Sequence, residues 1–300
     1  MTENRFRTWY RSKPGRPLVL AHRGDSSHAP ENTIEAAKLG LDSGADGWEF
    51  DVRVTKDGVP IVFHDVSLAR TTDVALRFAG DSRQTQGFLL ADFLWEEVRS
   101  LDAGSWFVDA EGGPRSAVEF GTLGRLAEFD RVLFCSGRIG VPTLAEALGV
   151  TARLDRLANV EIKPVGGDLD ALVNDVLRHI SDASMTSRSA VSSFDHEVVR
   201  RVASREPGVA TGALVEGPPE IPAAALLRSL GADALHAPAS AVGAATNGVA
   251  LLVYTVNDAR PGGLAERLGE AGVVGLFTDD PAALSIKYGI SPSSKRTRPH

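Results

Sequence analysis

The stretch from Leu18 to Asp65 decides the fold, because three apolar runs in it carry charged residues at regular places: LVLAH (18–22), GWEFDV (47–52) and PIVFH (60–64). Read as strands, in which side chains alternate between two faces, the middle run puts Glu49 and Asp51 on the same face. The segment 55–58, Thr-Lys-Asp-Gly, predicts a turn that folds the second and third runs into a hairpin. His64 then lies roughly opposite the two carboxylates.

Further strand-like runs continue downstream and alternate with segments of helical period. The runs are NVEIKP (159–164), SAVSSF (189–194), TGALVE (211–216), ADALHAP (232–238), LLVYTVN (251–257) and VGLFTD (274–279). The clearest helices are expected at Asn32–Ser43, Leu169–Ser181, His196–Ser204 and Leu264–Ala271. Alternation of this kind predicts an α/β fold with a parallel sheet, closed here as a (β/α)8 TIM barrel. Nine strand candidates compete for eight places, so one of them is expected to be a short terminal piece.

The chain is predicted to form one domain over residues 1–300. Residues 66–141 break the alternation and hold seven of the twelve Phe residues together with Trp95 and Trp106. This segment is expected to be an insertion between early barrel elements, either a satellite core or a lid over the barrel mouth. Residues 287–300 are expected to form a disordered tail.

Composition limits the partners of the chain. A net charge of −7 and a pI near 5.6 give no basic surface for nucleic acid. No apolar run reaches about 18 residues, which argues against stable membrane insertion. The single Cys135 suits a reducing compartment, and the N-terminus has no apolar signal region, so a cytoplasmic location is expected. The oligomeric state is left open.

Several motifs, in order and spacing, resemble the signature of the glycerophosphodiester phosphodiesterases. They are HRG (22–24), PENT (30–33), EFDV (49–52), TKDG (55–58) and HD (64–65), followed by PTL (142–144), VEIK (160–163), SF (193–194), TVN (255–257) and TD (278–279). The resemblance covers most of residues 17–285. It implies metal-dependent hydrolysis of glycerophosphodiesters, small molecules of lipid and glycerol metabolism, to glycerol 3-phosphate and an alcohol.

Three carboxylates, Glu49, Asp51 and Glu161, are the candidates for holding one divalent cation. Oxygen ligands favour a hard ion, either Mg²⁺ or Ca²⁺. The alternative for Glu161 is an ion pair with Lys163, which lies two residues later on the same strand face. Carboxylates inside short apolar runs are costly unless they are paired or bind metal, which favours the metal site.

His22 and His64 suit acid and base roles near neutral pH. The resemblance implies that they are the general acid and base, without saying which is which. Arg23 is expected to bind a phosphate oxygen through its guanidinium, with an ordinary ion pair as the alternative. Lys163 is a second candidate for the phosphate. Water can attack directly, or the glycerol 2-hydroxyl can attack first to give a cyclic phosphate.

Two other functions stay open. A lysophospholipase D would use the same residues on a substrate with an acyl chain, for which the Phe-rich insertion could supply a groove. A non-catalytic barrel that binds phosphodiesters is the second alternative. Such a barrel would normally have lost a histidine or a carboxylate, and all five of these residues are present here.

Overall fold

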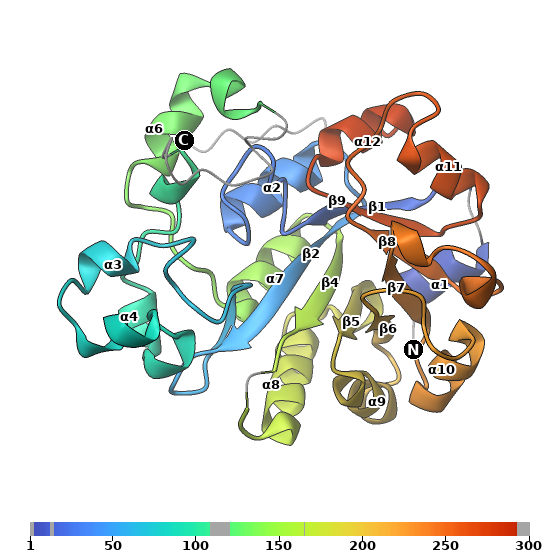
Figure 1. Ribbon diagram of the computed structural model, residues 1–300, viewed down its shortest axis with the longest axis horizontal. Helices are drawn as coiled ribbons and strands as arrows, with labels where there is room; N and C mark the ends of the chain where they lie inside the picture. The colour runs from blue at the N-terminus through green and yellow to red at the C-terminus, as the bar shows by residue number, and fades with distance from the viewer. Residues whose placement is uncertain (1–2, 13–14, 109–120, 165, 293–300) are drawn as a thin grey trace.

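A closed barrel of eight parallel strands, with helices around the outside, forms the body of the protein (Figure 1). The computed structural model describes residues 3–12, 15–108, 121–164 and 166–292. The barrel strands are β1 (Leu18–His22), β2 (Gly47–Val54), β4 (Leu157–Ile162), β5 (Ser189–Ser193), β6 (Ala210–Leu214), β7 (Ala234–Pro238), β8 (Leu251–Tyr254) and β9 (Gly275–Thr278). β1 pairs in parallel with both β2 and β9, which closes the sheet. The predicted (β/α)8 TIM barrel is confirmed.

The ninth strand candidate is a short hairpin partner. β3 (Pro60–Val62) runs antiparallel to β2, with Val52 opposite Val62, so the turn predicted at 55–58 forms. β3 lies at the end of the strand order, outside the parallel barrel. Because β3 stops at Val62, His64 lies in the loop beyond it.

The helices that follow barrel strands include all four that the periodicity predicts. They are α2 (Ile34–Asp42), α7 (Leu144–Arg153), α8 (Leu169–Asp182), α9 (His196–Arg205), α10 (Ala223–Leu230), α11 (Leu264–Glu270) and α12 (Pro281–Lys287). Thr33 caps α2, since its Oγ1 accepts a hydrogen bond from the N–H of Ala36 at 3.2 Å. The sequence reading missed α1 (Arg5–Ser12), which precedes the first strand.

Shorter helices occupy the connections. The α-helical ones are α3 (Val74–Arg77), α4 (Trp95–Val98) and α6 (Glu128–Phe134). The 3₁₀ helices are η1 (Ser82–Gln86), η2 (Leu90–Asp92), η3 (Ser105–Phe107), η4 (Leu123–Arg125), η5 (Thr186–Arg188), η6 (Ala239–Ala241) and η7 (Ala244–Thr246). No helix in the described ranges is both long and apolar enough to span a membrane.

The buried apolar residues of the barrel form two clusters, one between the strands and the surrounding helices and one inside the barrel. Trp48, Phe50 and Val52 of β2 belong to the large cluster that the strands share with the surrounding helices. Leu18 and Leu20 of β1 belong instead to a smaller cluster that includes Phe6 and Tyr10 of α1. Since β1 begins at Leu18, α1 packs against the N-terminal ends of the strands. The C-terminal ends are therefore the side on which loops can build a site.

The Phe-rich segment 66–141 builds two small cores of its own, as far as it is described. Phe88 and Phe93 are buried in one of them with residues of β3, and Phe107 and Phe134 are buried in the other. Residues 109–120 of this segment lie outside the described ranges, as do residues 293–300 of the predicted tail. Residue 287, the first of that tail, is the last residue of α12.

Candidate active site

The alternation of side chains along the strands brings the predicted polar residues into the barrel mouth. On β2, the residues between the outward-facing Trp48, Phe50 and Val52 point inward, which places Glu49 and Asp51 inside. On β4, Glu161 follows the same rule. Together with the two predicted histidines, Glu49 and Glu161 line a cavity of about 280 Å³.

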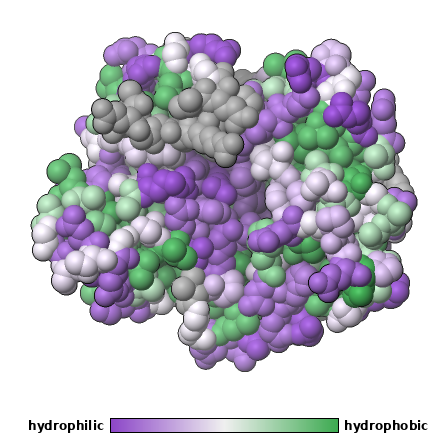
Figure 2. Space-filling view, in the orientation of Figure 1, coloured by the Kyte–Doolittle hydropathy of each residue, from purple (hydrophilic) through white to green (hydrophobic). Residues whose placement is uncertain are grey.

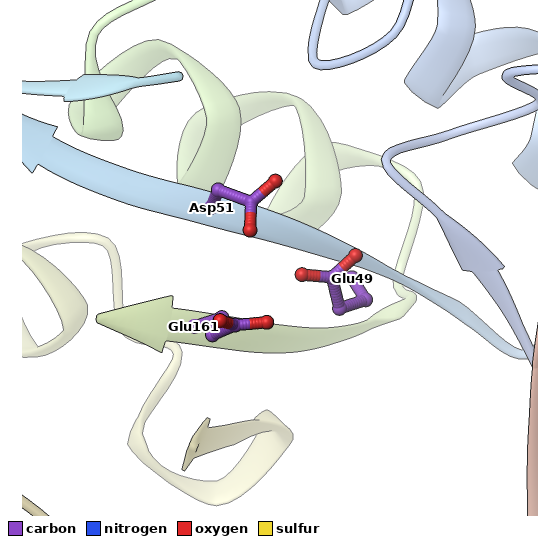
Figure 3. A group of neighbouring side chains, drawn as sticks. All are labelled: Glu49, Asp51 and Glu161. Carbon is purple, nitrogen blue, oxygen red and sulfur yellow. The ribbon is translucent and has the colours of Figure 1, made fainter. Parts of the chain in front are cut away.

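The three predicted metal ligands meet between two neighbouring strands. Asp51 of β2 and Glu161 of β4 are direct partners in the parallel register. One oxygen from each of Glu49, Asp51 and Glu161 lies within 4.8 Å of the others, and the side chains point toward one another (Figure 3). All three residues are buried.

This carboxylate cluster is under electrostatic strain. Burial and the neighbouring charge of Asp51 raise the pKa of Glu49 to about 8. The buried Oε1 of Glu49 has no hydrogen-bond partner among the described residues. Burial also opposes ionisation of Asp51, but the charges of Arg23 and Lys163 outweigh it and hold its pKa well below the ordinary range. Crowded buried carboxylates with a free oxygen are the donor set that a hard divalent cation fits.

His22 is held by a carboxylate on one side and faces the cavity on the other. Its Nδ1 lies 2.7 Å from Asp279 Oδ1, and its Nε2 lies 4.0 Å from Glu49 Oε2. Burial and the charge of Arg23 lower the pKa of His22, but the hydrogen bond and charges of Asp279 and Glu49 prevail, so the pKa is raised. Asn257 donates in turn to Asp279 at 2.8 Å, which fixes that carboxylate.

His64 has an equivalent carboxylate in a more open setting. Its Nδ1 lies 2.6 Å from Asp65 Oδ1. Arg70 donates to the same carboxylate and to Glu31. A carboxylate on Nδ1 fixes the orientation of an imidazole and leaves Nε2 free to exchange a proton. Both predicted histidines therefore present Nε2 as the available nitrogen.

The two predicted phosphate-binding residues are engaged with carboxylates in this structure. Arg23 donates through Nη1 to Glu31 at 3.0 Å, and its Nε lies 3.3 Å from Asp51 Oδ2. Lys163 forms ion pairs with Glu161 and with Asp51, the latter at 3.2 Å. The ion pairs that the sequence analysis gave as the alternative for Arg23 and for Glu161 with Lys163 therefore do occur. Both Arg23 and Lys163 also line the cavity.

Sequence reasoning missed three contacts that organise the site. Asn32, which precedes the capping residue Thr33, donates to Asp51 Oδ2 at 2.8 Å. Glu31 links Arg23 to Arg70. Glu31 and Asn32 both belong to the PENT motif, which was the available sign that they matter for the site. The motif does not reveal which distant residues they contact.

His236, near the end of the apolar run 232–238, is a third histidine that lines the cavity. It is fully buried, packs against Phe277 at a ring distance of 5.1 Å, and has neither ring nitrogen paired with a described residue. Burial lowers the pKa of His236 to about 3. A neutral, enclosed imidazole is a wall of the cavity and a poor proton carrier near neutral pH.

Comparison with known proteins gives one consistent family. Residues 22–283 match the model of the glycerophosphoryl diester phosphodiesterase family. A glycerophosphodiester phosphodiesterase of Caldanaerobacter subterraneus is 33% identical over 89% of this chain and 96% of the relative. A Bacillus subtilis protein with the same name is 28% identical over 89% of this chain and 85% of its own length.

Solved structures agree in fold. A phosphodiesterase of Oleispira antarctica in complex with the product sn-glycerol-3-phosphate has a TM-score of 0.69 and 26% identity, covering 91% of this chain and 97% of that one. A protein of Silicibacter pomeroyi described as a putative glycerophosphoryl diester phosphodiesterase has a TM-score of 0.72 and 25% identity, covering 93% and 96%.

Proposed function

The chain belongs to the glycerophosphoryl diester phosphodiesterase family, and from this premise we propose that it hydrolyses glycerophosphodiesters to glycerol 3-phosphate and an alcohol. In this reaction an oxygen nucleophile forms a new bond to phosphorus, the bond from phosphorus to the leaving alcohol breaks, and the alcohol takes up a proton. The observation that carries the proposal is the cavity that His22 and His64 line together with Glu49 and Glu161, two members of the carboxylate cluster. The product bound by the Oleispira antarctica relative supports the choice of substrate class.

Glu49, Asp51 and Glu161 would hold one divalent cation, Mg²⁺ or Ca²⁺. The fit rests on their mutual approach, on their burial and on the unpaired Oε1 of Glu49. A bound cation polarises phosphoryl oxygens and neutralises charge that develops on them. Asn32 and the cationic neighbours keep Asp51 ionised and in place.

The two histidines would divide the proton transfers. His22 has a raised pKa and therefore keeps a proton more readily, so we assign it the role of general acid toward the leaving alcohol. His64 would act as the general base, with Asp65 holding its Nδ1 so that Nε2 accepts the proton of the nucleophile. Water or the glycerol 2-hydroxyl can be that nucleophile.

Arg23 and Lys163 would bind the non-bridging phosphate oxygens. Both carry positive charge to the wall of the cavity, where the net charge of the three carboxylates would otherwise repel an anionic diester. Guanidinium and ammonium groups are the usual protein partners of phosphate.

The two alternatives have less support. The lysophospholipase D activity needs an apolar groove. Phe88, Phe93, Phe107 and Phe134 of the insertion cannot supply it, because they are buried inside its small cores. Val66, Leu89 and Leu90 of the insertion do line the neighbouring groove, so the comparison of glycerophosphocholine with lysophosphatidylcholine decides between the two activities. A binding protein without catalysis would not need two histidines, each held by its own carboxylate.

The organisation of the chain fits this function. We propose that residues 66–141 are a cap on one barrel domain of residues 1–300, since their small cores pack against β3 and α2 next to the mouth. A cytoplasmic location is our proposal too, and the exposed unpaired Cys135 supports a reducing compartment.

The test is hydrolysis of glycerophosphocholine, glycerophosphoethanolamine and lysophosphatidylcholine by the purified protein with Mg²⁺ or Ca²⁺. Release of glycerol 3-phosphate is measured for the first two substrates, and release of lysophosphatidic acid for the third. Turnover of the two water-soluble diesters is expected. Binding of these diesters without any turnover would instead favour the non-catalytic alternative.

A further inference from the structure

A second, larger cavity of about 670 Å³ adjoins the active site. Lys163 lines both cavities, so the groove begins where the phosphate-binding wall ends. The end of β2, the loop after it, η2 of the insertion and the start of α8 form its walls. Figure 2 shows hydrophilic surface gathered over β2 and β4 at the centre of this face, where the molecule is hollowed.

Arg53 lies at the inner end of this groove. It follows Asp51 by two residues on β2, so its side chain continues the same strand face outward from the carboxylate cluster. Its Nε donates to the carbonyl oxygen of His64 at 2.6 Å. That bond fixes the guanidinium and leaves its two Nη groups for another partner.

Two of the three positive side chains that line the groove, Arg53 and Lys56, have no ion-pair partner within the described part of the chain, whereas Lys163 is paired with Glu161 and Asp51 and the two carboxylates of the groove accept hydrogen bonds or pair. Asp168 accepts hydrogen bonds from two N–H groups at the start of α8, and Asp175 pairs with Arg178. Arg53 is half-buried at the groove, and its only side-chain hydrogen bond to a described residue goes to a backbone carbonyl and not to a carboxylate. A desolvated guanidinium without a direct carboxylate partner is an anion site.

The geometry points to a leaving alcohol that carries its own anionic group, a carboxylate or a phosphate, bound by Arg53 with help from Lys56. This inference rests on the proposed function. Arg53 and Lys163 follow Asp51 and Glu161 by two residues toward the C-terminal ends of their strands, and Lys163 joins the two cavities. A diester whose glycerol end is at the cluster would therefore extend its other end toward the groove. A cationic alcohol such as choline would meet two unpaired positive charges there.

Glycerophosphoserine and glycerophosphoethanolamine provide a matched pair of probes, because they differ by one carboxylate on the leaving alcohol. We expect the wild-type protein to prefer glycerophosphoserine by at least about tenfold in kcat/KM, mainly through KM, since a charge-assisted pair with Arg53 forms only with the carboxylate. The preference should shrink as ionic strength rises.

Arg53→Gln should bring the ratio of the two kcat/KM values close to one, and Arg53→Lys should retain part of it. Arg99→Gln is the control, because Arg99 lies on α4 of the insertion with its own ion pair to Glu96. A structural role for Arg53 through the His64 carbonyl would slow both substrates equally and leave the ratio unchanged.

Equal wild-type turnover of the two diesters, or a ratio that survives in Arg53→Gln, would overturn this inference and leave the proposed function intact. Failure of the wild-type protein to hydrolyse either diester would overturn both. Because the wild-type ratio and its salt dependence need no variant, the test holds even if Arg53→Gln does not fold.

Discussion

The inner cavity and the groove beside it share Lys163, yet they use charge in opposite ways. In the inner cavity each positive group is paired: Arg23 with Asp51 and Glu31, Lys163 with Glu161, and His22 with Asp279. In the groove, the two cations other than Lys163, namely Arg53 and Lys56, have no such partners among the described residues. Paired groups hold a fixed geometry for the reaction, while unpaired groups remain available to a ligand. The chemistry is therefore built into the inner cavity, and selectivity is built into the groove.

The largest effect should come from the histidines of the inner cavity. His22→Ala and His64→Ala should each lower kcat on the order of 10²–10⁴-fold, because each removes a proton-transfer group. The double variant should lose much less than the product of the two losses if the histidines act as one unit. His179→Gln is the control, because His179 lies on α8, outside the cavity, and is partly exposed. Fully multiplicative losses would show that the histidines do not share a step.

A smaller effect is expected when the support of His22 is removed. Asp279→Asn should lower kcat by roughly 10–100-fold, as for other residues that orient a catalytic group. Asp279 raises the pKa of His22, so its loss lowers that pKa, and the alkaline limb of the kcat profile should move to lower pH. The measurement is kcat against pH, with the exposed Asp182→Asn as control. An unshifted alkaline limb would remove His22 from the role of general acid.

The contrast between cavity and groove can also be tested with an acyl chain. Glycerophosphocholine and lysophosphatidylcholine share a leaving group and differ in the glycerol substituent. We expect kcat/KM to favour glycerophosphocholine by about tenfold, a difference of about 1.4 kcal/mol in transition-state binding, because the aromatic side chains Phe88, Phe93, Phe107 and Phe134 are buried away from any substrate. The comparison is made below the micelle concentration. A tenfold preference for the lysolipid would assign the insertion to acyl binding.

The smallest effect concerns stability without metal. The pKa of Glu49 is raised from 4.5 to about 8, so the folded protein favours the protonated form. The stability contributed by that form is complete below pH 4.5 and is lost as pH rises through about 8. In EDTA, Glu49→Gln should therefore raise the Tm at pH 8 by about 2 °C or more and flatten its decline with pH. The exposed Glu96→Gln is the control. A lower Tm for Glu49→Gln at pH 8 would contradict the claim that the buried Glu49 carboxylate destabilises the metal-free protein.

The sequence predicted the residues of the inner cavity because strand alternation is local. Glu49 and Asp51 on one strand, and Glu161 with Lys163 on another, follow from a period of two, and parallel pairing then brings their strand ends together. The helix α1 escaped prediction because its eight residues include five of Arg, Thr and Ser, which obscures the apolar face formed by Phe6 and Tyr10.

Contacts between distant segments could not be predicted in the same way. The pairing of Arg70 with both Asp65 and Glu31 depends on how the insertion folds back. The groove at Arg53 likewise needs β2, η2 and α8 to meet, and these elements lie far apart in the sequence. The alternation of side chains predicts which face of a strand a residue occupies. It does not predict which residue of a distant segment will contact it.

The most direct test of the central claim is the dependence of turnover on a divalent cation. The protein is dialysed against EDTA, and release of glycerol 3-phosphate from glycerophosphoethanolamine is measured before and after addition of Mg²⁺ or Ca²⁺, for the wild type and for Glu161→Gln. The account predicts loss of turnover in EDTA, recovery on addition of the ion, and a higher ion concentration for half-recovery in Glu161→Gln. Full turnover in excess EDTA would contradict it.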